Sequence, residues 1–486
     1  MNTEKRLLLF LGLSLGALLF FNRFNQPAQL LDAEKYKLAE TAPPAVSKSP
    51  NVLPPKELSL KTESLTFKDF TITVSLTGGF IKDIKINKYG ETLLYKNLFF
   101  LSAYADKEFR LERVENGIRL SWNGLSGKVT KEIRFISPYL LSFEVTAPGK
   151  IDKLILFQSE KDKKSFYSRY QEVFYKAKKI KRIGWSKVKT TLSFVNPGLI
   201  GTRDRYYTAV FLSPSPGQYS WERQDRQAID LAFYPEKPSS PISGRLFLGP
   251  QDIKILNPLG IQGVIYFGVF NGIGFIILNL LYFFFGWFHN WGVSIILLSA
   301  LIYLILSPLT ISSTKSMKKM QELQPEIEAL RKKLKDTPQK LNKEVLELYR
   351  KYKVNPLGGC LPMLLQIPIF FALYQVLIRS VEIKGAHFLW IKDLAKPDNI
   401  VRFAAPLPIL KIDGIHILPI LMAVIMFLQQ KMTVPQGQSS EQQKMMTMIF
   451  PLVFGFIFYN FSAGLVLYWF CNSLFTFLYQ LRLARH

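Results

Sequence analysis

The segment "KYKVNPLGGCLPMLLQIPIFFALY" occupies residues 351–374 and changes character within a few positions. It starts as a basic helix end and continues as an apolar helix with three prolines, a Gly–Gly pair and a lone glutamine, Gln366. Prolines remove backbone donors and bend helices. A long apolar helix is typical of a membrane span. The segment therefore predicts a bent span that starts at a basic surface and carries one polar position inside.

The whole chain combines a large apolar fraction with a large charge. Of its 486 residues 48% are hydrophobic, and the formal net charge is +26. The two properties are segregated, because residues 255–314 contain no Asp, Glu, Lys or Arg, and about 20 apolar residues are enough to cross a bilayer. The positive charge is spread over several segments and accompanies no nucleic-acid-binding motif, so no nucleic acid is expected as a partner.

The N-terminal part predicts an anchor and a linker. In residues 1–25, Lys5 and Arg6 precede an apolar run that no clear small-residue cleavage site follows. This pattern favours an uncleaved transmembrane anchor with a cytoplasmic N-terminus, and a signal peptide removed on maturation is the alternative. Residues 26–58 hold six prolines and are predicted to be a Pro-rich linker.

Residues 59–257 predict an all-β sandwich domain. The stretches "TFKDFTITVSL" and "FIKDIKINKYG" alternate apolar and polar residues, and "TGG" between them is a turn signal. The runs "KVTKEIRFIS" and "YLLSFEVTA" repeat the pattern. Two cysteines, Cys360 and Cys471, both lie in later apolar segments, so the domain has no disulfide framework.

A basic helical hairpin is predicted at 311–355, where we count twelve Lys or Arg and six acidic residues. Its first apolar stripe runs through Met317, Met320, Leu323, Ile327, Leu330 and Leu334, and the second through Leu341, Val345, Leu348 and Tyr352. The "DTP" at 336–338 separates the two helices. Short basic loops stay in the cytoplasm, so the hairpin is expected there.

Parity then fixes the number of spans. With the N-terminus inside and the β domain outside, a single crossing must lie between the β domain and the hairpin, within residues 258–311. We assign it to the start of 291–486, and we assign 258–290, which is rich in Gly and Asn, to an interfacial helix on the outer side. Four further apolar segments follow the hairpin, which gives six spans with both termini cytoplasmic.

Six motifs carry a resemblance to a known family: "KVNPLGGCLPMLLQIPIFFALY", "NWGVSIILLSALIYLILSPLT", "MKKMQELQPEIEALRKKLKD", "WIKDL", "LPILMAVIMFLQQKM" and "FSAGLVLYWFCNSL". They resemble the YidC/Oxa/Alb family of membrane protein insertases, in the bacterial form with a large periplasmic domain. The resemblance implies a five-span insertase core at 291–486 in the inner membrane. It also implies a hydrophilic groove, open to the cytoplasm and to lipid, that helps nascent membrane proteins to insert and fold.

The resemblance assigns roles to single residues of this chain. Groove candidates are Tyr303, Gln366, Gln430, Asn472 and Ser473. Hinge candidates are Pro356, Gly358, Gly359, Pro362 and Pro368. The basic residues of the cytoplasmic hairpin are Lys318, Lys319, Arg331, Lys332 and Lys333. Neither a catalytic residue, a metal nor a cofactor is implied. The partners implied are nascent membrane proteins, the Sec translocon and the phospholipid bilayer, with the ribosome or the signal recognition machinery as further candidates.

Four of the five groove candidates have a structural alternative. Gln366 could bond to a neighbouring helix, as intramembrane amides often do, and Asn472 and Ser473 could serve helix packing. The family usually has an arginine five residues before the proline of "PLT", where this chain has Tyr303. A groove charge is therefore in doubt, and Tyr303 either offers a hydroxyl to the groove or packs as an aromatic ring.

Two other functions compete with insertion. Large β-sandwiches of this kind resemble sugar-mutarotase folds, but that chemistry needs a histidine beside a carboxylate, and all four histidines lie outside the β domain. We therefore do not expect an enzyme. A small-solute transporter is the alternative for the helical region, but inverted repeats and intramembrane charges are not evident in the sequence.

Overall fold

The computed structural model describes residues 61–485 apart from 126, 163–169, 213–214, 237–240, 335–336, 353, 355–360, 404–413 and 434–440. The predicted anchor, the whole of the predicted linker and the hinge candidates Pro356, Gly358 and Gly359 lie outside these residues. The chain forms two compact units, with the boundary between Ile265 and Tyr266. Each unit is described by itself.

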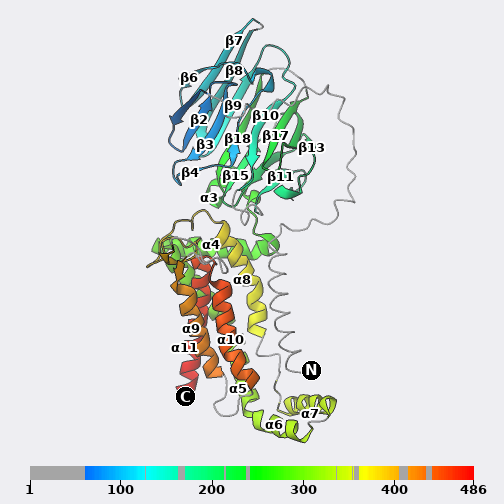
Figure 1. Cartoon of the computed structure of the whole chain (residues 1–486), viewed down its shortest axis with the longest axis vertical. Coiled ribbons are helices and arrows are strands. Elements are labelled where there is room, and N and C mark those ends of the chain that lie inside the picture. Colours follow the sequence, from blue (N-terminus) through cyan, green and yellow to red (C-terminus); the bar gives the residue numbers. More distant parts are fainter. Residues whose placement is uncertain are drawn as a thin grey trace. The chain divides into compact units, whose positions relative to one another are not determined.

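The first unit is a large all-β domain built from three antiparallel sheets (Figure 1). The nine-stranded sheet has the order β12 (Ile180–Gly184), β11 (Glu172–Lys176), β14 (Leu199–Arg203), β15 (Tyr207–Leu212), β18 (Ile242–Pro250), β9 (Leu140–Thr146), β8 (Gly127–Ser137), β7 (Gly117–Gly124), β6 (Arg110–Val114). The five-stranded sheet has the order β13 (Leu192–Val195), β16 (Gly217–Arg223), β17 (Ala228–Pro235), β10 (Leu154–Glu160), β5 (Tyr95–Lys96). The four-stranded sheet runs from β1 (Thr62–Thr66) through β2 (Phe70–Ser75) and β3 (Phe80–Ile86) to β4 (Glu91–Thr92).

The alternating patterns in the sequence correctly predicted four strands of this unit, and "TGG" the turn between the first two. Strands β2 and β3 pair antiparallel, as do β8 and β9. Aromatic rings join the two larger sheets, since Phe211 of β15 lies 5.8 Å from Tyr219 of β16, ring centre to ring centre. Both rings are almost fully buried. The apolar face of each sheet is therefore turned towards a shared core, as the period-two pattern requires.

Buried ionisable groups of the β domain include Asp204, Asp230 and Lys131. Asp204 follows β14, and its Oδ1 accepts the backbone N–H groups of Tyr206 and Tyr207, each at 2.7 Å. Burial nevertheless raises the pKa of Asp204 to about 7 and that of Asp230 on β17 to about 6. Burial lowers the pKa of Lys131 on β8 to about 7. These groups make the stability of the domain depend on pH.

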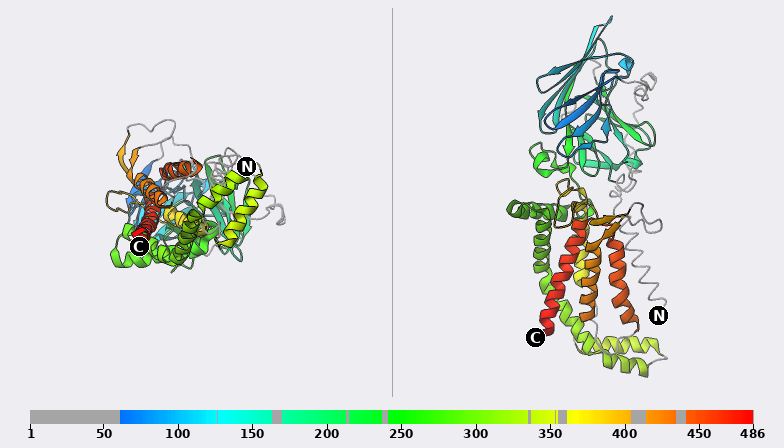
Figure 2. Two further views of the ribbon diagram at one scale, coloured as in Figure 1. Left: turned by 90° about the horizontal axis from the view of Figure 1, so that it is seen from below. Right: turned by 60° about the vertical axis from the view of Figure 1, so that its left-hand side comes forward.

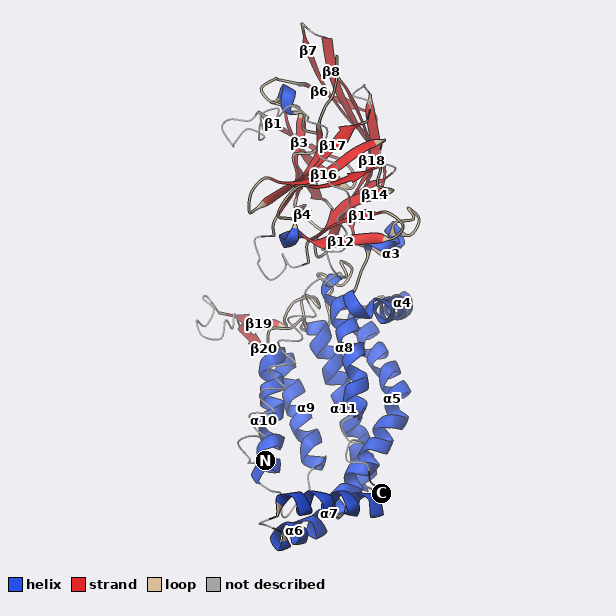
Figure 3. Ribbon diagram, turned by 90° about the vertical axis from the view of Figure 1, so that its right-hand side faces the viewer, coloured by secondary structure: helices blue, strands red, loops and turns tan. Residues whose placement is uncertain are grey.

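The second unit is helical. Its helices are α4 (Asn271–Phe288), α5 (Trp291–Glu322), α6 (Gln324–Lys333), α7 (Pro338–Lys351), α8 (Leu361–Arg379), α9 (Ile417–Thr433), α10 (Glu441–Phe458) and α11 (Ala463–Arg485). Helices α5 and α8–α11 run side by side, and α4 lies across one end of this bundle (Figures 1 and 2). The short strands β19 (Asn399–Arg402) and β20 (Gly414–His416) lie at the same end, whereas α6 and α7 lie at the opposite end (Figure 3). We call these the loop end and the hairpin end.

Three helices among the described residues are long and apolar enough to cross a membrane: Gly268–Phe288, Trp291–Met320 and Ala463–Arg482. Shorter apolar helices are Leu365–Arg379, Ile417–Met432 and Ile449–Phe458. The first of these six segments is the one for which the sequence predicted an interfacial helix over 258–290. That helix starts only at Asn271, because Gly260 and Gly268 have φ values of +70° and +81° that a helix does not accommodate.

The proline of "SPLT" does not end its helix. Pro308 lies inside α5 and cannot donate a hydrogen bond to the carbonyl of Leu304, four residues earlier. The Ser307 hydroxyl donates to this carbonyl instead, at 2.8 Å. α5 can therefore continue to Glu322, beyond the predicted start of the hairpin at residue 311.

The second helix of the hairpin begins at Pro338, as the "DTP" signal predicted, but the first helix has a break that its stripe did not indicate. The first stripe predicted one helix through residues 317–334, but the chain turns at Leu323 and α6 begins at Gln324. Pro325 explains the break, because its ring clashes with the carbonyl of the preceding turn. Leu323 and Ile327 are buried with Val354, and Val345 and Leu348 of α7 pack against them.

The buried carboxyls of the β domain give a pH prediction. Asp204 and Asp230 hold a proton in the folded state at pH values where they ionise in the unfolded chain, with a pKa of about 3.9. Their contribution to stability is complete below about pH 4 and is lost as the pH rises through 6–7. We expect the urea concentration at the unfolding midpoint to decrease as the pH is raised from 4.5 to 6.5. The fluorescence of the buried Trp185 and Trp221 reports unfolding.

Asp204→Asn is the matched variant, because an amide oxygen can still accept both backbone bonds. Between pH 4.5 and 6.5 the free energy of unfolding should decrease in both proteins. The decrease should be smaller in the variant than in the wild type, by on the order of 2 kcal/mol. An identical pH slope in the two proteins would contradict the assignment. Lys131 does not interfere, since it is protonated in both states below pH 6.5.

Candidate functional site

The five groove candidates lie on four helices of the bundle. Tyr303 is on α5, Gln366 on α8, Gln430 on α9, and Asn472 and Ser473 on α11. At 1.5 Å per residue, all five lie about 14–20 Å along their helices from the loop end. The fold thus brings them to similar depths, near or beyond the middle of a bilayer core about 30 Å thick.

Gln366 makes a contact between helices. Its side chain is buried, with 7% exposed, and its Nε2 donates a hydrogen bond to the Tyr468 hydroxyl of α11. The structural alternative stated for this residue is thus present in the described structure. A groove role for Gln366 would require exchange of this hydrogen bond, because the amide faces a protein hydroxyl.

Tyr303 is half-buried and packs as an aromatic ring. Its ring centre lies 5.6 Å from that of Phe475 on α11. Because it is only half-buried, the ring is not fully enclosed by the bundle. The arginine usual in the family is absent here, and the side chain that replaces it is neutral and partly accessible.

Two glutamine oxygens lie deeper towards the hairpin end. The Oε1 atoms of Gln430 and Gln480 are buried, and neither accepts a hydrogen bond from any described residue. Buried polar atoms normally have a partner, and water or another molecule can supply the missing donor. On α11, Ser473 is almost fully buried and Asn472 is half-buried. The backbone carbonyl of Asn472 accepts a hydrogen bond from the Thr476 hydroxyl at 2.9 Å.

The loop end is closed by hydrogen bonds between loops and helix ends. The first N–H groups of α11, from Ala463 and Gly464, donate to the carbonyls of Lys396 and Leu394 at 2.8 and 2.9 Å. The buried Asp398 accepts the N–H of Leu418 at the start of α9, at 2.7 Å. Below these contacts, a cluster of large rings fills the bundle: Phe370, Phe454, Phe458 and Trp469.

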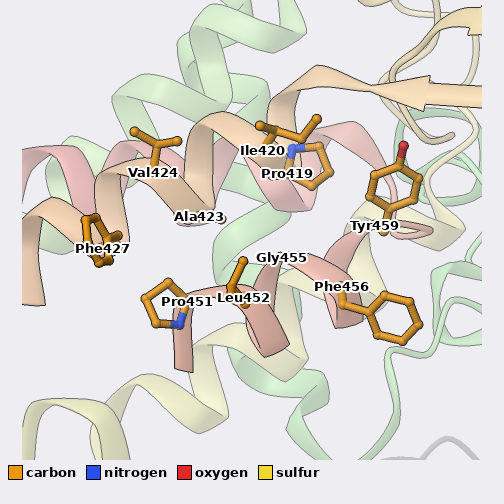
Figure 4. A pocket seen from close by; sticks show the side chains of 10 residues that line it. All are labelled: Pro419, Ile420, Ala423, Val424, Phe427, Pro451, Leu452, Gly455, Phe456 and Tyr459. Carbon is orange, nitrogen blue, oxygen red and sulfur yellow. The ribbon is translucent and has the colours of Figure 1, made fainter. Parts of the chain in front are cut away.

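An apolar groove of about 480 Å³ lies between α9 and α10 (Figure 4). The helices approach closely where a Cβ on Gly455 would lie 3.1 Å from the Cβ of Ala423. The lining residues are Pro419, Ile420, Ala423, Val424, Phe427, Pro451, Leu452, Gly455, Phe456 and Tyr459. Leu452 and Phe456 keep more than half of their side-chain surface exposed. The groove therefore offers an apolar surface at the outside of the bundle.

The remaining candidates fall into two groups. Of the hinge residues, Pro362 and Pro368 lie in α8, and the other three lie outside the described residues. The basic hairpin residues Lys318, Lys319, Arg331, Lys332 and Lys333 are all exposed. Within the described part of the chain, no group of three His, Cys, Asp or Glu side chains is placed to hold a metal ion.

The sequence analysis missed Tyr468 and Gln480. A signal for both exists, because Tyr468, Asn472, Thr476 and Gln480 recur every four residues on α11. This spacing places polar groups along one gently drifting side of the helix. Tyr468 had been included in a quoted motif, but its aromatic ring concealed its role as a hydrogen-bond acceptor.

Comparison with known proteins now identifies the helical region. A family model described as the 60Kd inner membrane protein matches residues 283–486, which include α5–α11. Residues 283–486 belong to this family. Its proteins include those named membrane protein insertase YidC, and the match confirms the resemblance carried by the motifs.

Relatives with that name come from several bacteria. The chain is 42% identical over 287 residues to the protein of Pelobacter propionicus, an alignment that covers 57% of this chain and 52% of that one. It is 45% identical over 244 residues to the protein of Geobacter sulfurreducens, in an alignment that covers 50% of this chain and 43% of that one. It is 37% identical over 344 residues to the protein of Cupriavidus metallidurans, an alignment that covers 67% of this chain and 59% of that one. The chain spans about half the length of the curated relatives it matches.

Two kinds of solved structure are similar. A crystal structure of an active YidC insertase with its first transmembrane domain covers 87% of this chain and 92% of its own, at 20% identity and a TM-score of 0.43. A putative aldose 1-epimerase from Escherichia coli covers 40% of this chain and 99% of its own, at 9% identity and a TM-score of 0.27. Scores this low do not establish a shared fold.

The bond between Gln366 and Tyr468 predicts coupled stabilities. Gln366→Leu and Tyr468→Phe should each lower the stability of the bundle in detergent by about 1 kcal/mol, because each removes the same hydrogen bond. The double variant should cost little more than either single variant. Thermal unfolding of the purified wild type, the two single variants and the double variant measures these stabilities.

Tyr303→Phe provides the matched control, since Tyr303 packs on Phe475 rather than on Gln366. Its effect should add to that of Gln366→Leu. If the Gln366 and Tyr468 variants were additive as well, the hydrogen bond would not be a contributor to stability.

Proposed function

We propose that this protein is a membrane protein insertase that inserts nascent integral membrane proteins into the inner membrane and helps them to fold. The observation that carries the proposal is that the helical bundle, residues 283–486, belongs to the 60Kd inner membrane protein family. Several relatives of the chain are named as insertases. The proposal extends their activity to this chain.

The polarity of the bundle supports this function. A client must move a polar segment through hydrocarbon, where each unsatisfied backbone group costs several kcal/mol. Tyr303, Asn472 and the buried oxygens of Gln430 and Gln480 offer neutral hydrogen-bonding groups from mid-bundle to the hairpin end. Rings and loop contacts fill the other end. We propose a wet groove that opens at the hairpin end and shortens the dry part of the path.

The apolar groove between α9 and α10 complements the polar one. Its lining is apolar and reaches the outside of the bundle, so it suits the apolar part of a client leaving for lipid. A client with both a polar and an apolar part would thus find a surface for each. No bond is made or broken in this scheme, and neither a cofactor nor a metal enters it.

We further propose the orientation of the chain. The exposed Lys and Arg side chains of α6 and α7 favour a cytoplasmic hairpin end. Five spans then come from α5 and α8–α11, and an N-terminal anchor is the sixth. The position of α4 across the loop end supports an interfacial helix on the periplasmic side (Figure 1). The β domain, which precedes α4 in the sequence, would then be periplasmic. Both termini would then be cytoplasmic.

The proposed partners are the lipid bilayer, nascent membrane proteins and, for some clients, the Sec translocon, with the ribosome or the signal recognition machinery as further candidates. A solute transporter remains the second candidate. It is less well supported, because the sequence of residues 361–378, 417–430 and 446–481 contains no charged residue that could bind an ion or a charged solute. The enzyme reading has no histidine in the β domain to support it.

Reconstituted vesicles test the proposal. Purified protein in liposomes should insert a small single-span client with a polar translocated tail, without ATP or an ion gradient. Combining Tyr303→Phe with Gln430→Leu should slow insertion roughly thirtyfold, because one net hydrogen bond is worth about 1 kcal/mol and two are lost. A client with almost no translocated tail should insert at the wild-type rate. Protease protection of the tail measures insertion.

Ser299→Ala is the matched control. Ser299 is also a neutral polar residue of α5, but it is fully buried nearer the loop end and donates to the carbonyl of Ile295 in its own helix, at 2.7 Å. Its loss should leave insertion unchanged. Equal insertion of polar-tailed clients by the double variant and the wild type would remove these residues from the mechanism, and inactive wild-type vesicles would refute the insertase assignment.

A further inference from the structure

A tight turn at the loop end exposes two large apolar side chains. Phe388 and Ile391 exchange backbone hydrogen bonds of 2.9 and 2.8 Å, so Leu389 and Trp390 occupy the two tip positions. Leu389 is 75% exposed and Trp390 40% exposed. Two large apolar residues are unusual in such turns, where Gly, Asn and Asp prevail.

The turn is held rigidly on the bundle. Ile391 is buried, and the ring of Phe388 lies so close to Gly292 at the start of α5 that no Cβ would fit there. Asp393 accepts the N–H groups of Gly385 and Ala395, each at 2.9 Å. These contacts fix the base of the turn and leave its tip pointing away from the core.

The backbone of the tip is strained. Leu389 has a φ of +51°, which glycine adopts freely and a leucine adopts only at a cost. The exposed Leu389 side chain gains little from packing within the protein. The fold therefore keeps an unfavourable backbone conformation that presents an apolar side chain outward.

Trp390 is oriented at the same tip. Its indole Nε1 donates to Asp398 at 3.2 Å, which satisfies the polar atom of the ring within the protein. The exposed remainder of the ring is apolar. Lys392 is exposed beside the turn, and Lys396 is exposed and pairs with Asp393 at 3.0 Å. An apolar tip with an indole ring and flanking lysines is typical of protein segments that lie at the interface of a bilayer.

We propose that the Leu389–Trp390 turn is a lipid anchor that inserts into the acyl-chain boundary of the leaflet at the loop end. The inference goes beyond the proposed function and requires only that the bundle spans a membrane. A lipid surface is favoured over a protein partner because α4, which lies across the same end, also exposes large apolar side chains: Phe283, Trp287 and Phe288. The anchor would fix the depth of the rigid loop end while the hairpin end admits clients.

Site-specific fluorescence tests the anchor in the full-length protein. Both native cysteines are replaced by alanine, and an NBD label is attached in the Leu389→Cys variant. The control is Lys392→Cys, an exposed charged position three residues further along. In nanodiscs of phosphatidylethanolamine and phosphatidylglycerol, lipids with a spin label at acyl carbon 5 should quench the label at 389 at least twofold more than that at 392. Iodide should show the opposite order.

Two results would overturn the proposal. Strong iodide quenching and no lipid quenching at 389 would place the tip in water, and protection from both quenchers would place it against protein. A second variant guards against misfolding: Leu389→Gly relieves the positive φ and should fold at least as stably in detergent. In vesicles it should weaken lipid quenching of a label placed by Trp390→Cys at least twofold, and an unchanged signal would contradict an anchoring role for Leu389.

Discussion

Hydrogen bonding at the helix ends is the constraint on which the bundle depends. In lipid, a backbone N–H or carbonyl without a partner costs several kcal/mol, so a helix that starts within or near the membrane must be capped by protein. Residues 386–398 supply these partners for α9 and α11, through the carbonyls of Leu394 and Lys396 and the carboxylate of Asp398. One short segment therefore closes the loop end and fixes the spacing of two helices.

The polarity of the bundle follows from this closure. Some buried polar atoms of the loop end, such as Ser462 Oγ, have no partner among the described residues. Aromatic rings fill the bundle next to them, so a continuous wet path could begin only further down. The described oxygens of Gln430 and Gln480 lie in that part. They are neutral, and neutral groups are much less costly to hold in a bundle than charges. In the proposed groove, polarity without the arginine would come from amides and hydroxyls, which would bind peptide groups without selecting for tail charge.

Much of the fold was predictable, and the failures have physical reasons. Period-two alternation correctly predicted the strands β2, β3, β8 and β9, because one face of each strand is buried. The apolar stripes correctly predicted that Leu323 and Ile327 pack against α7, but the break at Leu323 was missed because the apolar stripe continues across Pro325. The start of α4 was missed because two glycines of positive φ precede it. For the site, spacing revealed the depth of Gln366, but not that Tyr468, about one hundred residues later, accepts its hydrogen bond. Contacts between distant segments leave no local signal in a single sequence.

The central claim is that the bundle is closed at the loop end and wet towards the hairpin end. The most direct test is thiol labelling in vesicles, with Gln430→Cys and Ser299→Cys each made in a protein whose native cysteines are replaced by alanine. A membrane-impermeant maleimide applied from the hairpin side should label the Gln430→Cys variant at a rate within about tenfold of an exposed hairpin position, as expected for a water-filled site. The Ser299→Cys variant should stay unlabelled from either side. Labelling of both variants at equal rates, or labelling at position 430 from the side of the β domain alone, would contradict a groove that opens at one end.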